Sequence, residues 1–424
     1  MNTSLASQYT AFVGIDWADA KHDYCIQSSS ADLNDKTIGI VAHEPAALDE
    51  WLLALHQQYG GKLAVALELS TGPIVSILQK YDFVEIFPIT PSTLAKYREA
   101  FKPSRAKDDP TDAELALDLL MRHPERFRKL KPQSVEMRTL TTLVEQRRKL
   151  VHERVRVTNR LRNTLKQYYP QVLEWFDHID TPLFCDFLER WPTLKKAKRD
   201  RKTTLTVFFT NHNMNRANVL ERRFSAIDSA TALTSDPAVI DPHKLLAMVH
   251  ADMLKTLLRS IAKYDKQIAS IAPQHDDYHL FESLPGAGPM LTPRLLAAFG
   301  EQRDRFNSAA ELQQYAGIAP VTERSGKKHW VHWRWQCPTF LRQTFIEWAS
   351  QSIKYSAWAR AYYDQQRNKG STHNAAVRSL AFKWIRFLYS CWKSSIPYDE
   401  ARYINVLKKR GSLLMPHINL AKPA

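Results

Sequence analysis

Residues 11–16 read AFVGID, a short apolar run that ends in a carboxylate and is typical of a buried strand. Four more strand-like runs follow at residues 23–27, 37–42, 62–69 (KLAVALEL) and 84–88. Apolar residues recur instead at helical spacing over residues 45–59. Three early strands, a helix, and then strands that alternate with helices predict an α/β domain over residues 1–128.

The sequence after residue 128 has a helical period. Over residues 135–169 apolar side chains recur at helical spacing and arginines crowd the other positions, which predicts a long basic amphipathic helix. A second long helix is expected from about Pro242 to Ile271, after an irregular stretch over residues 171–242. Two long helices around such an insert predict a coiled-coil dimerisation arm over residues 129–275.

A mainly α-helical domain is predicted over residues 276–400, and residues 401–424 are expected to form a peripheral tail. Helices are expected over residues 339–356 and 374–392. The run LPGAGP, residues 284–289, predicts a tight glycine turn between two helices.

The composition favours a polyanionic partner. Lys and Arg number 59 against 44 Asp and Glu, which gives a formal charge of +15. The four cysteines lie far apart without a C-x-x-C pair, so the sequence suggests neither a zinc finger nor a disulfide framework: Cys25, Cys185, Cys337 and Cys391. We expect a reducing, cytoplasmic compartment and no membrane span, because the chain lacks a signal-peptide pattern and a run of eighteen apolar residues.

Four carboxylates have the arrangement of a metal site. Asp16 ends the first strand, and Glu68 ends a later strand-like run just before a Gly-Pro. Asp109 and Asp112 lie three residues apart around Pro110, so they share one face of a helix. Hard divalent cations prefer carboxylate oxygens, and two such ions can stabilise the attacking and leaving oxygens of a phosphoryl transfer. The pattern therefore predicts one or two Mg²⁺ ions.

Each acid taken singly also fits a structural role. Asp16 and Glu68 are acceptable as surface carboxylates past strand ends, and Asp109 or Asp112 as a helix N-cap. Asp108 leaves the third acid ambiguous, although Asp109 keeps the spacing to Asp112. The order of strand Asp, strand Glu and helical Asp-x-x-Asp is much more specific than any one of these residues.

Ser325 lies in the segment TERSGKKHW. A serine hydroxyl can attack phosphorus and leave a phosphoserine link to DNA. Five neighbours could supply positive charge or handle the proton: Arg324, Lys327, Lys328, His329 and His332. By itself, however, the Ser-Gly dipeptide favours a simple turn.

With these motifs the chain resembles the DEDD-type insertion-sequence transposases related to the Piv DNA invertase, a family of bridge-RNA-guided recombinases. The resemblance covers most of the chain. Five segments carry it: FVGIDWA (12–18), ALELSTGP (66–73), AKDDPTDAELAL (106–117), LPGAGPMLTPRLLAAFG (284–300) and RFNSAAELQQYAGIAPVTERSGK (305–327). It implies a RuvC-like (RNase H-like) first domain, Mg²⁺ at the four acids, a separate transposase domain, and Ser325 as the nucleophile.

Two features have alternative interpretations. Gly286 and Gly288 fit either a helix-hairpin-helix turn that binds phosphate through backbone amides or a simple helix–helix turn. Trp330, Trp333 and Trp335 alternate with polar residues, and fit either one face of a buried strand or a base-stacking platform. We prefer the buried strand. This Trp- and His-rich segment and the long insert in the arm depart from the family pattern.

The leading hypothesis is a transposase, a site-specific recombinase that cuts and rejoins DNA through Ser325 with Mg²⁺ at the acidic quartet. A RuvC-like nuclease that cuts by metal-activated water is the first alternative, and a non-catalytic nucleic-acid-binding protein is the second. The expected partners are donor and target duplex DNA, a structured guide RNA implied by the resemblance, and a second copy in a dimer or tetramer. Arg154, Arg160 and the basic run 195–202 would contact phosphates in the bacterial nucleoid.

Overall fold

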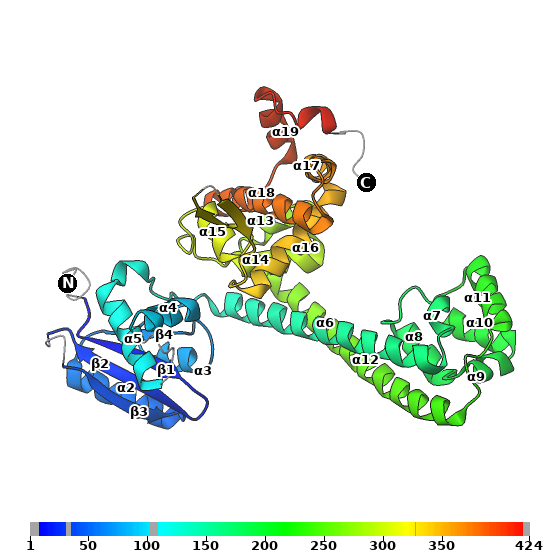
Figure 1. Ribbon diagram of the computed structural model, residues 1–424, viewed down its shortest axis with the longest axis horizontal. Coiled ribbons are helices and arrows are strands. Elements are labelled where there is room, and N and C mark those ends of the chain that lie inside the picture. Colours follow the sequence, from blue (N-terminus) through cyan, green and yellow to red (C-terminus); the bar gives the residue numbers. More distant parts are fainter. Residues whose placement is uncertain (1–7, 31–34, 102–108, 327, 419–424) are drawn as a thin grey trace. The chain divides into compact units, whose positions relative to one another are not determined.

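The computed structural model describes residues 8–30, 35–101, 109–326 and 328–418, with the side chains of Asp109 and His329 outside that description. The chain divides into two compact units, Met1–Pro132 and Gln133–Ala424. The first unit holds a β-sheet with helices, and the second is mainly helical (Figure 1). This mixed α/β start and mainly helical remainder confirm the coarser part of the predicted fold class.

The strands of the first unit form one mixed sheet in the order β3-β2-β1-β4-β5. The strands are β1 (Ala11–Trp17), β2 (Lys21–Ser28), β3 (Thr37–Ala42), β4 (Leu63–Leu67) and β5 (Val84–Pro88). β1, β2 and β3 pair antiparallel, whereas β4 runs parallel to both β1 and β5. All five predicted strands therefore form. The fourth is shorter than expected, so Glu68 follows the strand and does not end it.

Helices cover both faces of this sheet. They are α2 (Pro45–Tyr59), α3 (Pro73–Leu78), α4 (Pro91–Phe101), α5 (Asp109–Arg122) and the 3-10 turn η1 (Pro124–Arg126). Successive side chains of a strand point to opposite faces. Val13 and Leu67 therefore pack with α2 and α3 on one face, and Phe12 and Ala66 with α4 and α5 on the other. Because β4 is covered on both sides, all of its residues are buried and apolar.

Helix α5 lies directly on β1 at Gly14. A Cβ at that position would lie 2.0 Å from the carbonyl oxygen of Ala113 and 2.7 Å from the backbone nitrogen of Leu117. Real Cβ atoms do not approach other atoms so closely. The atoms that this Cβ would meet belong to the backbone of α5. The missing side chain of Gly14 therefore sets the distance between the helix and the sheet.

The second unit begins with a long helix, α6 (Val135–Tyr168), which packs along α12 (Pro237–Ile271) and forms an arm with it (Figure 1). The hydroxyl of Ser134 caps α6 by accepting a hydrogen bond from a backbone amide three residues on, at 3.1 Å. Arg147 and Asp265 form an ion pair between the two helices. Both predicted long helices therefore form.

The stretch over residues 171–242, predicted to be irregular, is helical, and that expectation was wrong. It holds α7 (Val172–Trp175), α8 (Pro182–Arg190), α9 (Leu194–Arg199), α10 (Lys202–Asn211) and α11 (Ala217–Ser229). These helices enclose an aromatic core in which Phe187, Trp191 and Phe209 are fully buried. They are too short to repeat a helical period over many turns, so periodicity gave little signal. Helix α12 also begins earlier than expected and continues through Pro242.

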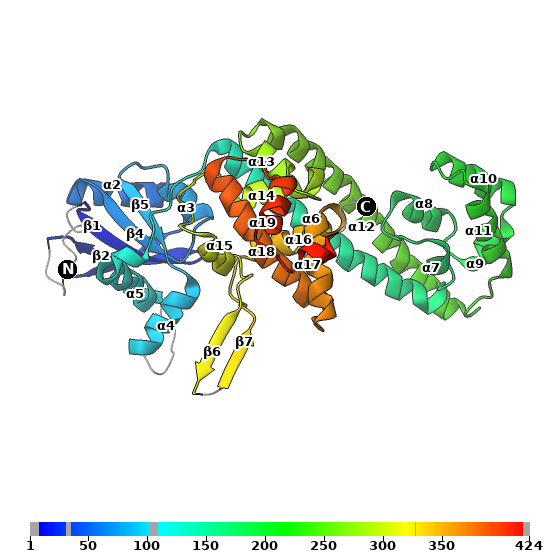
Figure 2. The same ribbon diagram turned by 90° about the horizontal axis from the view of Figure 1, so that it is seen from above.

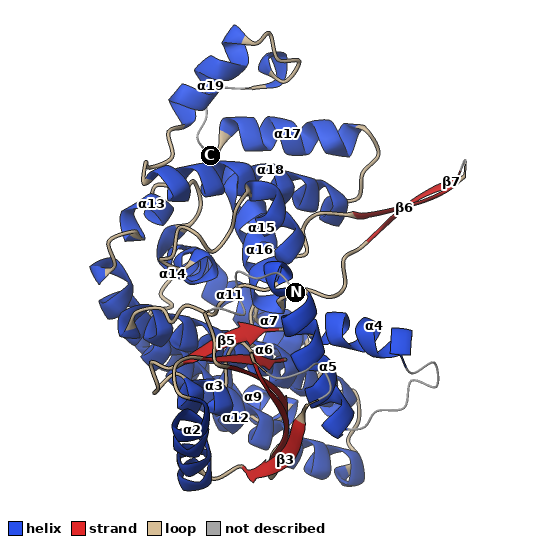
Figure 3. Ribbon diagram, turned by 90° about the vertical axis from the view of Figure 1, so that its left-hand side faces the viewer, coloured by secondary structure: helices blue, strands red, loops and turns tan. Residues whose placement is uncertain are grey.

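The rest of the second unit is a helical bundle around buried tryptophans. Its elements are η2 (Ala272–Gln274), α13 (Tyr278–Glu282), α14 (Gly288–Phe299), α15 (Ala309–Tyr315), α16 (Thr339–Tyr355), α17 (Ala357–Asn368), α18 (His373–Ser394), α19 (Glu400–Lys409) and η3 (Met415–His417). The ring of Trp384 lies 4.7 Å from that of Trp348 and 4.5 Å from that of Trp358. A hairpin of β6 (Val321–Ser325) and β7 (Lys328–His332) projects away from these helices (Figures 2 and 3).

The segment after residue 400 was expected to be a peripheral tail, yet it packs into the bundle. It forms α19, and Leu407 and Leu414 belong to the buried core of the bundle. The carboxylate of Glu400 accepts a hydrogen bond from the backbone amide of Ala357 at 2.9 Å. The described part of this segment is therefore a structural element of the bundle. None of the described helices is both long and apolar enough to cross a membrane.

Replacing Gly14 with Ala is expected to destabilise the first unit strongly. The new methyl group would overlap backbone atoms of α5, and overpacking a core costs about 1–3 kcal/mol even where side chains can yield. We expect at least about 3 kcal/mol here. Urea unfolding of the full chain, followed by circular dichroism, measures the loss.

Gly60→Ala is the matched control for this prediction. A Cβ at Gly60 would meet nothing within 4 Å, so this variant carries only the backbone cost of a side chain at φ 61° and ψ 172°, about 1–3 kcal/mol, without any overlap. If Gly14→Ala unfolded at the same urea concentration as the wild type, the close approach of α5 to β1 would be wrong.

Candidate functional site

Two of the predicted acids lie side by side where β1 and β4 end: Asp16 is the last but one residue of β1, which runs one residue further than predicted, and Glu68 follows β4. β1 and β4 are parallel neighbours, and Ile15 is the register partner of Leu67. Asp16 and Glu68 are the next residues of the two chains, which lie about 4.8 Å apart in a sheet. Both side chains are half-buried, and both have interaction partners. The structure therefore brings these two predicted site residues together.

Helix α5 adds Asp112 to the same face of the sheet. Asp16 lies two residues after Gly14, so its side chain leaves β1 on the face that α5 covers. Asp112 precedes Ala113, the residue whose carbonyl oxygen touches Gly14. The carboxylate of Asp112 is almost completely buried, with 2% of its surface exposed. A buried carboxylate needs either a cation or several hydrogen-bond donors to balance its charge.

Arg98 of α4 supplies that positive charge. Its Nε donates to Oδ1 of Asp112 at 2.5 Å, and its Nη2 donates to Oδ2 at 2.6 Å. The pair is bidentate, which is the strongest geometry for a guanidinium and a carboxylate. Both oxygens of Asp112 are thus engaged, so a metal ion would have to displace Arg98 or share the carboxylate with it. Sequence reasoning missed Arg98, because no motif links it to Asp112.

The remaining acids of the predicted quartet are only partly visible. Asp109 is the first residue of α5, but its side chain lies outside the described structure, and Asp108 lies outside the described residues. Among the residues that the structure describes, no three His, Cys, Asp or Glu side chains gather closely enough to hold a metal ion. The backbone arrangement suits a shared cation, whereas the Arg98–Asp112 pair opposes it. The Mg²⁺ site therefore stays a prediction.

Two further polar residues lie near these acids on β2. Asp23 is the antiparallel register partner of Asp16 and is buried on the same face. His22 lies on the opposite face beside Trp17 and is 2.9 Å from a ring nitrogen of His43. Burial, together with nearby His43, lowers the pKa of His22 to about 4. His22 is therefore neutral at pH 7 and adds no positive charge to the edge that holds Asp16.

Ser325 lies at the turn of the β6–β7 hairpin. It is the last residue of β6, is exposed, and has Lys328 as its cross-strand partner. Gly326 follows with φ of +55°, a left-handed conformation that favours glycine in a tight turn. The turn predicted from Ser-Gly therefore forms, and it holds the serine hydroxyl in solvent. Lys327 lies outside the described residues.

Charged side chains surround Ser325 along the hairpin. Arg324 and Lys328 are exposed. A ring nitrogen of His332 lies 3.3 Å from the carboxylate of Glu323, on the face of the ladder that carries Ser325. Hydroxyl, cations and histidine are the groups that an attack on a phosphodiester needs, so the hairpin can support such chemistry.

The preferred interpretation of the three hairpin tryptophans as one face of a buried strand was wrong. Trp330, Trp333 and Trp335 expose 43%, 45% and 76% of their surface. The alternation of aromatic and polar residues is the same for a buried strand and an exposed ribbon, so the sequence pattern alone could not distinguish them.

Gly286 lies in the turn between α13 and α14, and Gly288 is the first residue of α14. Both have positive φ, 73° and 55°. A Cβ on Gly286 would press against Tyr355 and the backbone of Gln351 in α16, which gives this glycine a packing role. A Cβ on Gly288 would meet nothing within 4 Å. Phosphate binding at this turn stays a prediction.

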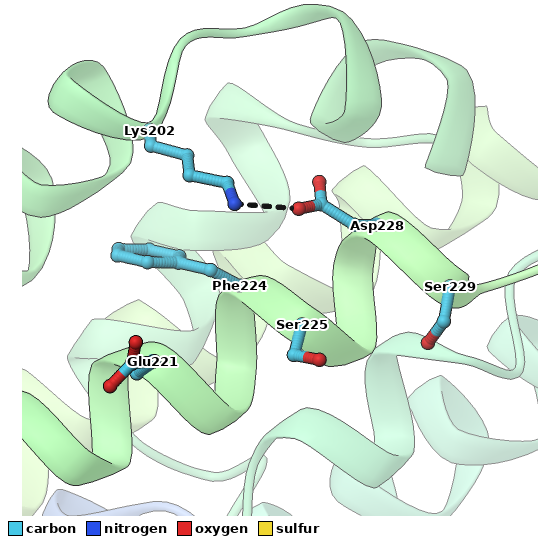
Figure 4. Close-up of a pocket in the computed structure, with 6 residues that line it drawn as sticks. All are labelled: Lys202, Glu221, Phe224, Ser225, Asp228 and Ser229. Carbon is cyan, nitrogen blue, oxygen red and sulfur yellow. Dashed lines mark ion pairs between the residues drawn. The ribbon is translucent and has the colours of Figure 1, made fainter.

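The predicted phosphate-binding residues of the arm differ in their surroundings. Arg154 forms an ion pair with Asp180 at 3.4 Å, whereas Arg160 is exposed. The basic run 195–202 spans the end of α9 and the first residue of α10. Its last residue, Lys202, pairs with Asp228 at 2.9 Å beside a pocket of about 610 Å³ (Figure 4).

Of the predicted residues, this pocket contains only Lys202, the last residue of the basic run 195–202. Its lining comes from α10 and α11: Lys202, Glu221, Phe224, Ser225, Asp228 and Ser229. The Lys202–Asp228 pair crosses it and satisfies both charges (Figure 4). The acids of the first unit and the hairpin of the second unit are therefore treated as two separate candidate sites.

Two transposase families match the chain in separate segments. A DEDD-type IS110 family, described as transposase, matches residues 13–170, and a family described as "Transposase IS116/IS110/IS902 family" matches residues 278–364. The first segment contains all four predicted acids. The second contains Ser325 and the turn with Gly286 and Gly288.

Similar proteins come from other insertion elements. A Streptomyces coelicolor protein, named as a mini-circle transposase for IS117, is 31% identical over 404 residues, which cover 93% of this chain and 96% of its own. A 42 kDa protein of insertion element IS900 from Mycobacterium paratuberculosis is 24% identical over 92% of this chain and 97% of its own. A 43.6 kDa protein of IS110 from Streptomyces coelicolor is 26% identical over 70% and 73% of the two chains.

Replacing Arg98 with Gln is expected to make the stability of the chain depend on Mg²⁺. The variant leaves the buried carboxylate of Asp112 without its partner, and breaking such a pair costs on the order of 3 kcal/mol. A cation bound at Asp112 would replace the lost charge. Millimolar Mg²⁺ should therefore raise the Tm of Arg98→Gln clearly more than that of the wild type, as measured by differential scanning calorimetry.

Arg294→Gln serves as the control for nonspecific effects of Mg²⁺. Arg294 is about as buried as Arg98, with 13% against 15% of its side chain exposed, and pairs with Glu347, whose side chain is 42% exposed, in a part of the chain where no metal is expected. Its Tm should fall and should not recover with Mg²⁺. Equal responses of the two variants to Mg²⁺ would count against a cation site at Asp112.

Proposed function

The chain belongs to the IS116/IS110/IS902 family of insertion-sequence transposases, and on that premise we propose that it cuts and rejoins DNA through a covalent bond between phosphorus and Ser325. The observation that carries this proposal is the position of Ser325, an exposed hydroxyl at the turn of a projecting hairpin. Hydrolysis would discard the energy of the phosphodiester, whereas a phosphoserine link retains it for rejoining.

The proposed step exchanges one phosphoester bond for another. Oγ of Ser325 attacks phosphorus, its proton passes to a nearby base, and the bond from phosphorus to one sugar oxygen breaks. That oxygen takes up a proton and leaves as a free hydroxyl, and rejoining is the reverse reaction with the hydroxyl of another DNA end. Lys328, as the cross-strand partner of Ser325, can reach the phosphate oxygens on which charge grows.

The acids of the first unit would hold Mg²⁺ in this proposal: Asp16, Glu68, Asp109 and Asp112. A bound Mg²⁺ supplies Lewis acidity toward phosphate oxygens. Without a bound ion, Arg98 balances the charge of Asp112. The strand order β3-β2-β1-β4-β5, with acids at the ends of adjacent strands, supports a RuvC-like (RNase H-like) fold for this unit.

A RuvC-like nuclease is the second candidate. Asp16, Glu68 and Asp112 come from one unit and from the segment that matches the DEDD-type family, so this site needs no serine to cut DNA by activated water. Under this alternative Ser325 is only a turn residue. The two candidates differ in one product, because only the first leaves DNA bound to the protein.

Duplex DNA and a structured guide RNA are the proposed nucleic-acid partners. The net charge of +15 and the exposed Arg160 on the arm support phosphate contacts.

Assembly as a dimer or tetramer is proposed through α12. One side of this helix packs on α6, while four of its apolar side chains, with Leu245 at 67%, are exposed: Leu245, Leu246, Val249 and Met253.

The covalent proposal is tested by trapping the reaction on labelled DNA and mapping the adduct by mass spectrometry. We expect one DNA fragment attached to Ser325 in the wild type. Ser325→Ala should lose the adduct, since Ala lacks the attacking oxygen. Thr322→Ala removes another exposed hydroxyl from the same hairpin and should keep the adduct. DNA cleavage without an adduct in the wild type would favour the nuclease.

The nucleic-acid proposal predicts binding that weakens steeply with salt. Each phosphate contact adds about 0.9 to the slope of log affinity against log salt for duplex DNA. Arg160→Ala should lower that slope by about one. Lys244→Ala is the control, because Lys244 is already paired with Asp241 at 2.7 Å. A chain that purifies free of RNA and recombines without it would contradict the guide.

A further inference from the structure

The hairpin presents a tryptophan on the same face as Ser325. In the antiparallel ladder Ser325 pairs with Lys328, and Glu323 pairs with Trp330. Paired residues and those two positions apart share a face, so Trp330 is the diagonal neighbour of Ser325, about 7–8 Å away. Its indole is 43% exposed although it is among the largest apolar side chains. An exposed indole beside a candidate nucleophile indicates a ligand with a flat ring.

A second pair of indoles follows where the hairpin joins the bundle. The rings of Trp333 and Trp335 are stacked, with centroids 6.2 Å apart and planes 28° from parallel. The guanidinium of Arg378, from α18, lies 4.1 Å from the ring centre of Trp333. This cation–π contact leaves the outer ring, that of Trp335, exposed over 76% of its surface.

Arg378 also anchors this part of the hairpin to the bundle. It donates to the carbonyl oxygen of Gly317 at 2.6 Å and to that of Ile318 at 3.1 Å. Gly317 and Ile318 precede β6, and Trp333 follows β7. The same guanidinium therefore contacts the segments on both sides of the hairpin. Arg378 therefore holds Trp333, one ring of the Trp333–Trp335 stack, in place before any ligand binds.

We propose that Trp330 and the Trp333–Trp335 stack bind unpaired bases of the DNA strand whose phosphate Ser325 attacks. This inference rests on the proposed function of Ser325. Strand exchange requires bases next to the cut to leave one partner before they pair with another. Base–aromatic stacking stabilises such bases without regard to sequence, because every base has a flat face.

The charges of the hairpin favour a nucleic-acid strand over an apolar protein surface. Arg324 and Lys328 are exposed, and the acid of the described ladder, Glu323, is already paired with His332. Alternating indoles and cations match a strand that alternates bases and phosphates. We commit to DNA because Trp330 adjoins Ser325, whose substrate is DNA in the proposed reaction.

The test measures how the full chain binds a fluorescein-labelled oligothymidylate by fluorescence anisotropy, at raised salt to suppress phosphate contacts. Trp330→Ala and Trp335→Ala should each weaken this binding by about 5- to 100-fold, the usual effect of removing one stacking ring. Trp330→Phe, which keeps an aromatic ring, should retain most of it. Affinity for a duplex of the same length should change little in all three variants.

Two controls separate this inference from the proposed nucleophile. Val331→Ala truncates an exposed apolar side chain on the opposite face of β7 and should bind oligothymidylate like the wild type. Ser325→Ala should also bind it normally, whether or not Ser325 forms an adduct. A 5-iodouracil-containing oligothymidylate should crosslink to Trp330 or Trp335 on irradiation.

Three results would overturn the inference. Trp330→Ala and Trp335→Ala could bind oligothymidylate with wild-type affinity. The substitutions could weaken binding of an oligouridylate but not of oligothymidylate, which would assign the surface to RNA. Finally, they could change the oligomeric state in size-exclusion chromatography while DNA binding is unaffected, which would assign it to a second copy of the chain.

Discussion

The packing of α5 on β1 at Gly14 determines where the acids of the first unit lie. A side chain on Gly14 would overlap the carbonyl oxygen of Ala113, so the helix can rest there only on a glycine. Small residues of β4, Ala64 and Ala66, continue this close contact on the same face. With the helix held at this distance, Asp112 is buried against the sheet face that carries Asp16. The missing side chain thus brings a helical carboxylate to the strand ends, and a bulkier residue would push it away.

Burying that carboxylate creates a demand for positive charge, which Arg98 meets with a bidentate pair. Such a contact stabilises the fold, and it also keeps Asp112 from being an open ligand.

The hairpin differs from this site because its functional candidates are exposed and not buried. Ser325 is exposed at a turn, close to exposed cations and to the partly exposed indole of Trp330. In the proposed reaction the acids hold a cation once Arg98 gives up Asp112, and the exposed hydroxyl attacks the DNA. Neither set of residues alone would cut and rejoin DNA by the proposed route.

The sequence predicted the elements whose pattern is long or strongly apolar. AFVGID and KLAVALEL gave β1 and β4, and the helical period gave α2 and the two arm helices, although α12 begins at Pro237 and not at Pro242. The helices over residues 171–242 were missed because each is only a few turns long. The adjacency of Asp16 and Glu68 followed from strand ends, whereas the Arg98–Asp112 pair did not, because it depends on how α4 packs against α5. The tryptophans were placed wrongly, since alternation does not distinguish a buried strand from an exposed hairpin.

The claim that α5 and the two strand ends form one cation site can be tested most directly by anomalous diffraction from crystals of the full chain soaked in Mn²⁺, which takes the same oxygen ligands as Mg²⁺. We expect an anomalous peak at the ends of β1 and β4, within about 2.0–2.4 Å of oxygens from Asp16, Glu68 and Asp112, with the Arg98 guanidinium moved off the carboxylate. A peak only elsewhere in the chain, or no peak at the ends of β1 and β4, would contradict it.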